Sequence, residues 1–574
     1  MAGNDVPSPA GTGTRAQAPP SDFEKLLARV LALRWRSSPV TATADGVHDF
    51  DEQLDRFDPG TLDLQLCEAE TLASALRAIP DEALSPDEAL DRAAVLGTLE
   101  ADLHEWREVR SWTFNPAIYP ELAIYSCYLL AVRDVLPLEQ RLRAIVARLG
   151  AVPRLLAEGL ANLAVPATVL LDNALQACAG ASDLFERTLP LLGEHAAPAL
   201  RSQLQDGCAA AWLALEQYAR DIRQLATSRG TRSFAIGADA FSYRFRHAHG
   251  FDCDPERLLS IGLAARERIE DQLREVASEI GGAQSWREQV RELGLDHPPA
   301  ERLLDAYRED VARVRAFVTA RQLATLTDDP LDVVPTPAFE RSYLPFAAYL
   351  QAGPLDPAGP GLLYVTPVDP ALGSEDVSAA LAHHAKLSRA LLVVHEGYPG
   401  HHLQCSRAKR DGSLARLLYG TPLMTEGWAL YCEQMMVEQG FVDDPAARLV
   451  QLRDALWRAW RVEVDVRLHR GEWTAEQTAE RAVIELGFDE PSARAEVARY
   501  CAWPTQASTY LVGRELLLDL RDRISAREGS AFQLGRFHDQ VLGFGHLSPA
   551  AIRGAMLDTR ERAPGDRSTA RVVA

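Results

Sequence analysis

Lysine is almost missing from this 574-residue chain, in which Lys25, Lys386 and Lys409 are the only three. The other basic residues are arginines, and 81 acidic residues outnumber 60 basic ones, so the formal net charge is −21. An electrostatic field of that sign repels phosphate backbones and anionic lipid surfaces over most of a protein surface. We therefore expect neither nucleic acid nor a membrane surface as a partner.

Long apolar runs and closely paired cysteines are also missing. The most apolar stretches, such as residues 163–171 and 390–394, are far shorter than the ~20 residues that cross a bilayer. None of the eight cysteines forms a C-x-x-C pair, which is typical of reduced, buried thiols. Residues 1–20 lack the apolar core of a secretory signal. These absences predict a cytoplasmic protein with a flexible tail over residues 1–20.

Strand signals are scarce, whereas helical periodicity is common. Residues 138–152 and 255–280 place apolar side chains at i, i+3, i+4 and i+7. The pairs Ser85-Pro86 and Asp254-Pro255 match an N-cap followed by proline at the first helical position. Only FSYRF (241–245) and GLLYVTP (361–367) suggest extended chain. The sequence therefore predicts an all-α fold with at most a small β element.

A Pro/Gly-rich stretch at residues 353–370 is the best candidate for an internal boundary. It predicts an N-terminal helical lobe over residues 21–352 and a C-terminal helical lobe over residues 371–574. The chain shows no repeat at a fixed period of 20–50 residues, which disfavours a solenoid.

The segment HEGYPGHH, residues 395–402, holds three of the 14 histidines within eight positions. In the common H-E-x-x-H zinc motif, two imidazoles one helical turn apart share the metal. Here His395 and His401 would lie about 240° apart on an unbroken helix, and His395 and His402 about 10.5 Å apart along its axis. Neither pair could then share a metal, so we expect Pro399-Gly400 to break the helix. Such a break brings His401 or His402 beside His395.

A third ligand is predicted in MTEGWALYCEQM, residues 424–435, which is expected to be helical. Glu426 is our choice, because a catalytic zinc is often bound by two histidines and one carboxylate, with a fourth position left for water. Glu433, two turns further on, suits a hydrogen bond to a ligand imidazole. Glu396, next to a ligand in sequence, suits a general base, and a purely structural zinc site would not need it.

Three further residues are weaker candidates. Tyr510 is our first choice of oxyanion donor and His538 our second, while Arg514, one turn after Tyr510, is a candidate for binding a substrate carboxylate. Each residue type is also common in ordinary packing. Asp465 and His469 share a helix face and are expected to pair.

The strings HEGYPGHHLQ and EGWALYCE resemble the DUF885 family, bacterial helical proteins grouped with the gluzincin metallopeptidases. Other matching strings cover residues 114–119, 245–263, 464–473, 499–517 and 537–549, so the resemblance spans most of residues 22–560. It implies one large, two-lobed helical metallopeptidase-like unit with a central cleft, and one zinc ion in the C-terminal lobe. Related zinc peptidases often place glycine directly before the second ligand, which favours His401 and leaves His402 as the alternative.

Together these observations predict a zinc-dependent hydrolase that cleaves amide bonds, most readily in short peptides. Two alternatives remain open. One is a non-catalytic binding or assembly protein on a degenerate peptidase scaffold, and the other is an amidohydrolase that acts on a non-peptide metabolite. The sequence leaves open the substrate identity, exo- or endo-action and the oligomeric state.

Overall fold

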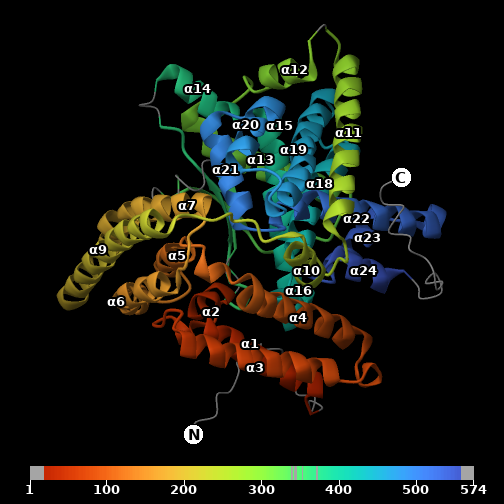
Figure 1. Ribbon diagram of the computed structural model, residues 1–574. Coiled ribbons are helices and arrows are strands. Elements are labelled where there is room, and N and C mark those ends of the chain that lie inside the picture. The colour runs from red at the N-terminus through yellow and green to blue at the C-terminus, as the bar shows by residue number, and fades with distance from the viewer. Residues whose placement is uncertain are drawn as a thin grey trace.

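A computed structural model describes residues 19–557 except residues 283, 338–340, 342–345, 352, 358 and 370–372. Within that part of the chain the fold is almost entirely helical, with a single three-stranded sheet (Figure 1). The prediction of an all-α fold with at most a small β element is confirmed. None of the described helices combines the length and apolar character that a bilayer crossing needs. The predicted tail lies outside the described residues as far as residue 18.

The N-terminal part of the chain forms nine helices, joined in places by short 3-10 and π-helical turns. Ser85 caps α4 in a capping box with Glu88, as the sequence predicts. The predicted helix over 138–152 is the first part of α6. The bounds are α1 Asp22–Ser37, α2 Pro39–Asp45, α3 Pro59–Ala78, α4 Pro86–His104, α5 Ile118–Val132, α6 Leu138–Asn162, α7 Thr168–Gly180, α8 Leu189–Leu192 and α9 Pro198–Arg229.

Four helices and the small sheet follow. Asp254 caps α11, which has the predicted bounds. The bounds are α10 Ala238–His249, α11 Pro255–Ile280, α12 Trp286–Leu293, α13 Leu303–Ala320, β1 Leu331–Pro335, β2 Ala347–Leu350 and β3 Gly361–Val365. The strand order is β1-β3-β2, with β1 parallel and β2 antiparallel to β3. Leu331 pairs with Gly361, and Ala347 pairs with Val365.

One of the two strand expectations is confirmed and the other is wrong. Residues 361–365 form β3, the central strand. FSYRF lies instead in α10, where Phe241 and Phe245 are both fully buried. The two aromatic residues are four positions apart, a spacing that fits one helix face as well as one face of a strand. The short alternating pattern therefore could not separate the two structures.

The C-terminal part of the chain is again helical. The bounds are α14 Ser374–Ala382, α15 Lys386–Glu396, α16 His401–Asp411, α17 Leu414–Leu418, α18 Pro422–Glu438, α19 Pro445–His469, α20 Ala475–Leu486, α21 Glu490–Ala502, α22 Gln506–Glu528, α23 Leu534–Leu542 and α24 Pro549–Met556.

Two hydrophobic cores hold the helices that matter for the site. In one, α13 and the sheet pack against α15, α18, α22 and α23. In the other, α10, α11 and α12 pack against α19 and α22. Each core combines chain from before and after residues 353–370, the stretch predicted to connect two lobes. The division into lobes stays a prediction.

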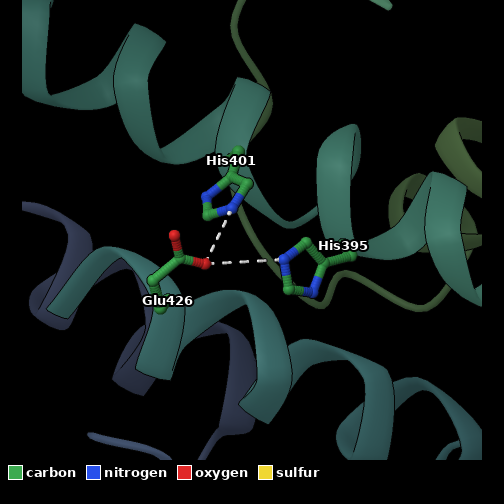
Figure 2. A group of neighbouring side chains, drawn as sticks. All are labelled: His395, His401 and Glu426. Atoms are coloured by element: carbon green, nitrogen blue, oxygen red, sulfur yellow. Dashed lines mark ion pairs between the residues drawn. The ribbon is translucent and has the colours of Figure 1, made fainter. Parts of the chain in front are cut away.

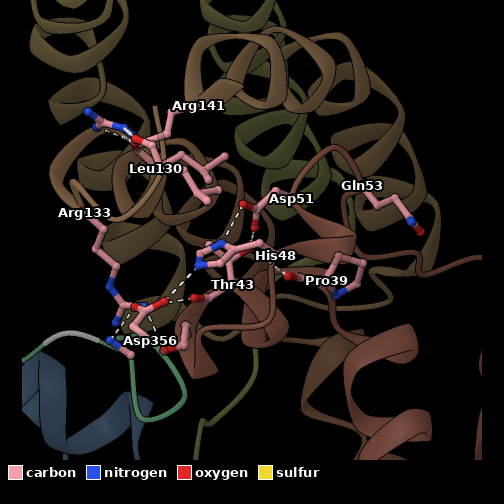
Figure 3. A network of polar contacts seen from close by, with 12 residues as sticks. Pro39, Thr43, His48, Asp51, Gln53, Leu130, Arg133, Arg141 and Asp356 are labelled. Carbon is pink, nitrogen blue, oxygen red and sulfur yellow. Dashed lines mark hydrogen bonds and ion pairs between the residues drawn. The ribbon is translucent and has the colours of Figure 1, made fainter. Parts of the chain in front are cut away.

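The loop between β2 and β3 is tied to the N-terminal helices by a buried aspartate (Figure 3). His48 pairs with Asp51 through Nδ1 and with Asp356 through Nε2, each at 2.8 Å. The hydrogen bond to Asp356, together with that to Asp51, raises the pKa of His48 to about 9. Arg133 lies 4.0 Å from the same Asp356 carboxylate. The histidine is therefore protonated at neutral pH and links the loop to the N-terminal part of the chain.

Candidate metal centre and cleft

The chain breaks and folds back between α15 and α16, as the Pro399-Gly400 pair predicts. Helix α15 ends at Glu396 and α16 begins at His401. A Cβ atom at Gly400 would lie 1.9 Å from the His395 carbonyl oxygen, so only glycine fits this turn. The Trp428 Nε1–H group of α18 donates to the Pro399 carbonyl at 2.8 Å and fixes the turn against that helix.

This turn directs His395 and His401 toward the same carboxylate oxygen of Glu426 (Figure 2). Glu426 Oε2 lies 3.7 Å from His395 Nε2 and 3.5 Å from His401 Nε2. One ligand atom from each of the three residues lies within 4.8 Å of the other two, and no other group of three or more His, Cys, Asp or Glu among the described residues does this. The three predicted ligands therefore come together.

Glu433 holds His395 from the opposite side. Its Oε1 accepts a hydrogen bond from His395 Nδ1 at 2.7 Å, which leaves Nε2 facing Glu426. Glu433 is 3% exposed, and its second oxygen has no partner among the described residues. A carboxylate in this position fixes the imidazole orientation and makes the imidazole a stronger ligand. The position of Glu433 therefore agrees with the predicted hydrogen bond to the imidazole of a predicted ligand.

The electrostatics of the group favour the charged forms. Burial opposes a charge on His395, but the hydrogen bonds that His395 donates to Glu426 and Glu433 outweigh this effect and raise the His395 pKa to about 10. Burial would raise the pKa of Glu426, yet the two histidines hold it well below its usual range. An ionised carboxylate together with two imidazoles forms a set of ligands that suits a divalent cation.

His402, the alternative second ligand, lies elsewhere. Its Nε2–H group donates to the Asp329 carbonyl at 3.1 Å, and its Nδ1 accepts from the Tyr349 hydroxyl at 3.2 Å. Both ring nitrogens are thus engaged, and the side chain is 1% exposed. The arrangement favours His401 as the second ligand.

A cleft of about 630 Å³ opens beside His395, one of the three predicted ligands. His395, Glu396, Glu433 and Tyr510 line it, together with residues of α12, α19 and α21. Within the part of the chain that the structure describes, the Glu396 carboxylate has no hydrogen-bond or ion-pair partner. It is therefore free to contact water or a substrate in the cleft.

Tyr510 reaches the cleft because α22 crosses α18 at a contact between two glycines. A Cβ atom at Gly513 would lie 2.0 Å from the Leu423 carbonyl oxygen, and one at Gly427 would lie 2.5 Å from the Gly513 Cα. Burial raises the pKa of the Tyr510 phenol, and the charge on nearby Glu426 raises it further. The phenol therefore keeps its proton and can donate a hydrogen bond.

His538 and Arg514 are not brought to this cleft. His538 is fully buried, its Nδ1–H group donates to the Leu323 carbonyl at 2.6 Å, and its Nε2 accepts from the Tyr431 hydroxyl at 2.7 Å. With both nitrogens occupied, it has no donor left for an oxyanion. Arg514 is 3% exposed and lines a separate cavity.

Asp465 supports the site from a distance, and its partner is not the expected one. It accepts hydrogen bonds from the backbone N–H groups of Thr505 and Ser508, at the start of α22. His469 Nε2 lies 3.8 Å from Asp465 but donates to the Tyr500 carbonyl at 3.0 Å. The aspartate therefore fixes the first turn of the helix that carries Tyr510.

The residues behind Tyr510 were not predicted from the sequence. The Arg461 guanidinium stacks over Tyr510 at 4.8 Å and over Trp457 at 3.9 Å from the ring centroids. It also pairs with Glu496 at 3.2 Å, and all four residues line the cleft. Because these residues come from α19, α21 and α22, no short sequence motif contains all of them. The W-x-x-x-R spacing at 457–461, one helical turn, was the one local signal.

The chain matches a family described as "Bacterial protein of unknown function (DUF885)" over residues 39–556. It belongs to this family. No curated protein matches it. Among solved structures, the DUF885 chain is similar to a "putative lipoprotein of unknown function" from Shewanella oneidensis, with TM-score 0.80 and 22% identity over 94% of this chain and 100% of that one. A "putative lipoprotein" from Colwellia psychrerythraea gives TM-score 0.80 and 22% identity over 93% and 98%. These likenesses show a shared fold.

Proposed function

We propose that this DUF885 protein is a zinc-dependent hydrolase that cleaves amide bonds, most readily in short peptides. The observation that carries the proposal is the close grouping of His395, His401 and Glu426, with His395 at the wall of an open cleft. A tetrahedral zinc site with bonds of about 2.0–2.1 Å places neighbouring ligand atoms about 3.4 Å apart. The separations of 3.5 and 3.7 Å are close to that value, and the three ligand atoms all lie within 4.8 Å of one another. The resemblance to gluzincin metallopeptidases supports the same conclusion.

A zinc ion held by these residues supplies a Lewis acid, which lowers the pKa of a bound water towards ~7 and polarises a carbonyl. Glu396 follows His395 directly and faces the cleft with an unpaired carboxylate. It takes the proton of the attacking water and delivers it to the leaving amine. Glu433 keeps the His395 ring in place during these steps.

Tyr510 stabilises the negative charge that develops on the substrate carbonyl oxygen. Its phenol lines the cleft and lies close enough to Glu426 for that charge to raise its pKa. A protonated donor fixed in advance, at a buried site, costs little reorganisation at the moment of reaction. Arg461, stacked on the ring, holds the phenol in place.

The lining of the cleft supports a short peptide as the substrate. Besides Tyr510, four aromatic side chains, those of Trp286, Phe346, Trp457 and Phe488, share its walls with arginines and carboxylates. A volume of about 630 Å³ is within the usual range for pockets that enclose small ligands. It admits a few residues of extended chain with apolar side chains and is too small for a folded domain.

Two measurements test the proposal. Metal analysis of the purified protein is expected to give one zinc per chain in the wild type and in the exposed-histidine control His195→Ala, and none in His395→Ala. On a mixed peptide library, Glu396→Gln is expected to keep its zinc and lose more than ~10²-fold in turnover. A zinc-free wild type, or a Glu396→Gln variant as fast as wild type, would contradict the assignment. Zinc binding without cleavage of any peptide would favour a binding scaffold or a small-amide substrate.

A further inference from the structure

A second cavity, of about 280 Å³, lies among helices α11, α18, α19 and α22. These helices pack against one another in the upper right part of Figure 1. None of its lining residues also lines the cleft described above. Leu452 of α19 lines this cavity, whereas Leu456, one turn later on the same helix, lines the cleft. The two hollows are therefore separate sites.

Arginines dominate the polar lining of the second cavity. Four of them, Arg268, Arg448, Arg514 and Arg521, come from three helices. Three carboxylates, those of Glu515, Asp519 and Asp522, also line the cavity, so its lining carries one positive charge in excess, in a chain whose net charge is −21. Like charges gathered in a partly buried space repel one another unless carboxylates or a bound anion balance them.

The carboxylates that line the cavity balance this charge only in part. Glu515 is shared by two cations, since Arg268 donates to both of its oxygens at 3.0 Å and Arg514 donates at 2.6 Å. Burial alone would raise the Glu515 pKa, but the two arginines outweigh it and lower the pKa. Asp519 is paired with Arg523, which lies outside the lining.

Two guanidinium groups are left without full compensation. Arg448 has no carboxylate within ion-pair distance among the described residues and donates only to the amide oxygen of Gln451. Arg514 is 3% exposed, and its Nε–H group is buried without a partner in the described part of the chain. Burial lowers the pKa of Arg448, and the charge on Arg514 lowers it further, while Glu438 acts in the opposite direction. Arg448 and Arg514 thus face one cavity as neighbouring cations.

We propose that this cavity binds the phosphate group of a small molecule through Arg448, Arg514 and Arg268. Arginine binds phosphate with paired N–H groups, and buried arginines gain most from a ligand that is both charged and rich in acceptors. Donors that converge from three helices suit three or four acceptor oxygens better than the two of a carboxylate. A bound anion also supplies the negative charge that Arg448 lacks among the described residues and an acceptor for the unpartnered Nε–H group of Arg514.

The test uses the full-length protein freed of metal with a chelator, so that phosphate cannot act at the other cleft. Inorganic phosphate is titrated by calorimetry at an ionic strength held constant with NaCl, with acetate titrated in parallel. We expect saturable phosphate binding, weaker or no acetate binding, and an affinity for phosphate that is at least about tenfold lower in Arg448→Gln. The matched control is the Arg274→Gln variant. Arg274 also lies on α11, but it pairs with Asp271 and Glu270 and does not line the cavity.

A second variant keeps the test informative if Arg448→Gln does not fold. Gln272→Glu places a carboxylate at the half-buried cavity wall with little change in shape, and it is also expected to abolish phosphate binding. The proposal is overturned if wild type shows no saturable response to phosphate beyond that to NaCl, if acetate binds as tightly, or if both variants bind like Arg274→Gln. Because zinc and peptide cleavage are not involved, failure here leaves the proposed hydrolase function untouched.

Discussion

Replacing Gly513 with alanine tests how the site is assembled. This glycine contacts α18 at the point where Glu426 and Tyr510 approach each other. The added methyl group would lie 2.0 Å from the Leu423 carbonyl oxygen, whereas Cβ atoms essentially never approach another atom closer than 3.0 Å. The two helices must therefore separate by about 1 Å at least, because a backbone carbonyl inside a helix has no room to turn aside.

That displacement has two expected costs. Overpacking of this kind lowers the free energy of unfolding by about 1–3 kcal/mol. The better helix propensity of alanine offsets less than about 1 kcal/mol of that loss. We expect a net loss of about 1–2 kcal/mol in the free energy of unfolding. A shift of about 1 Å between catalytic groups can also cost ~10²-fold in turnover. Zinc content should change little, because all three ligands lie on α15, α16 and α18.

Urea unfolding, zinc analysis and turnover on a cleaved peptide measure the three effects. Gly150→Ala is the matched control, since Gly150 lies inside α6 with no atom within 4 Å of an added Cβ. It should gain about 0.5–1 kcal/mol and leave turnover unchanged. If Gly513→Ala were as stable as Gly150→Ala and as active as wild type, the glycine contact would not set the distance between α18 and α22.

Three further predictions concern single side chains. His401→Ala should lose its zinc and His402→Ala should keep it, and equal zinc content in the two variants would refute the choice of ligand. Glu433→Gln should weaken zinc binding by about 10–100-fold, measured by competition with a chromophoric chelator, and an unchanged affinity would exclude its orienting role. His48 has a pKa raised from 6.5 to about 9, so its stabilising effect should be complete below about pH 6.5 and fade as the pH rises through 9. Urea unfolding of wild type and His48→Gln should therefore differ most at pH 6 and converge above pH 9, while a constant difference would contradict the raised pKa.

Much of the fold and half of the site could be predicted because their signals are local. Helix caps such as Ser85 and Asp254 act within one turn, and the break before His401 follows from a proline and a glycine next to each other. The proposed ligands lie close in sequence. Helix geometry and the known ligand preferences of zinc are therefore enough to predict them. The same reasoning cannot tell His401 from His402, because what removes His402 is a carbonyl 73 residues away.

The predictions that His538 and Arg514 act in the cleft were wrong because contacts distant in sequence decide where these side chains lie. His538 looked available because nothing nearby in sequence uses its nitrogens, yet Leu323 and Tyr431 occupy both. Arg514 follows Tyr510 by four residues and shares its helix face, but four residues also rise about 6 Å along the axis. That rise carries Arg514 from the cleft to the second cavity. Short-range spacing gives the direction of a side chain and does not show what packs in front of it.

The three proposed metal ligands all lie within residues 395–426, whereas Tyr510 belongs to a helix much later in the chain. In kinetic terms the ligand group has low contact order, because few residues must be ordered to bring its members together. The tyrosine arrives only when α22 docks on α18, a contact of long range. A refolding chain is thus able to capture its metal before the cleft is complete, so zinc uptake should precede the recovery of catalysis.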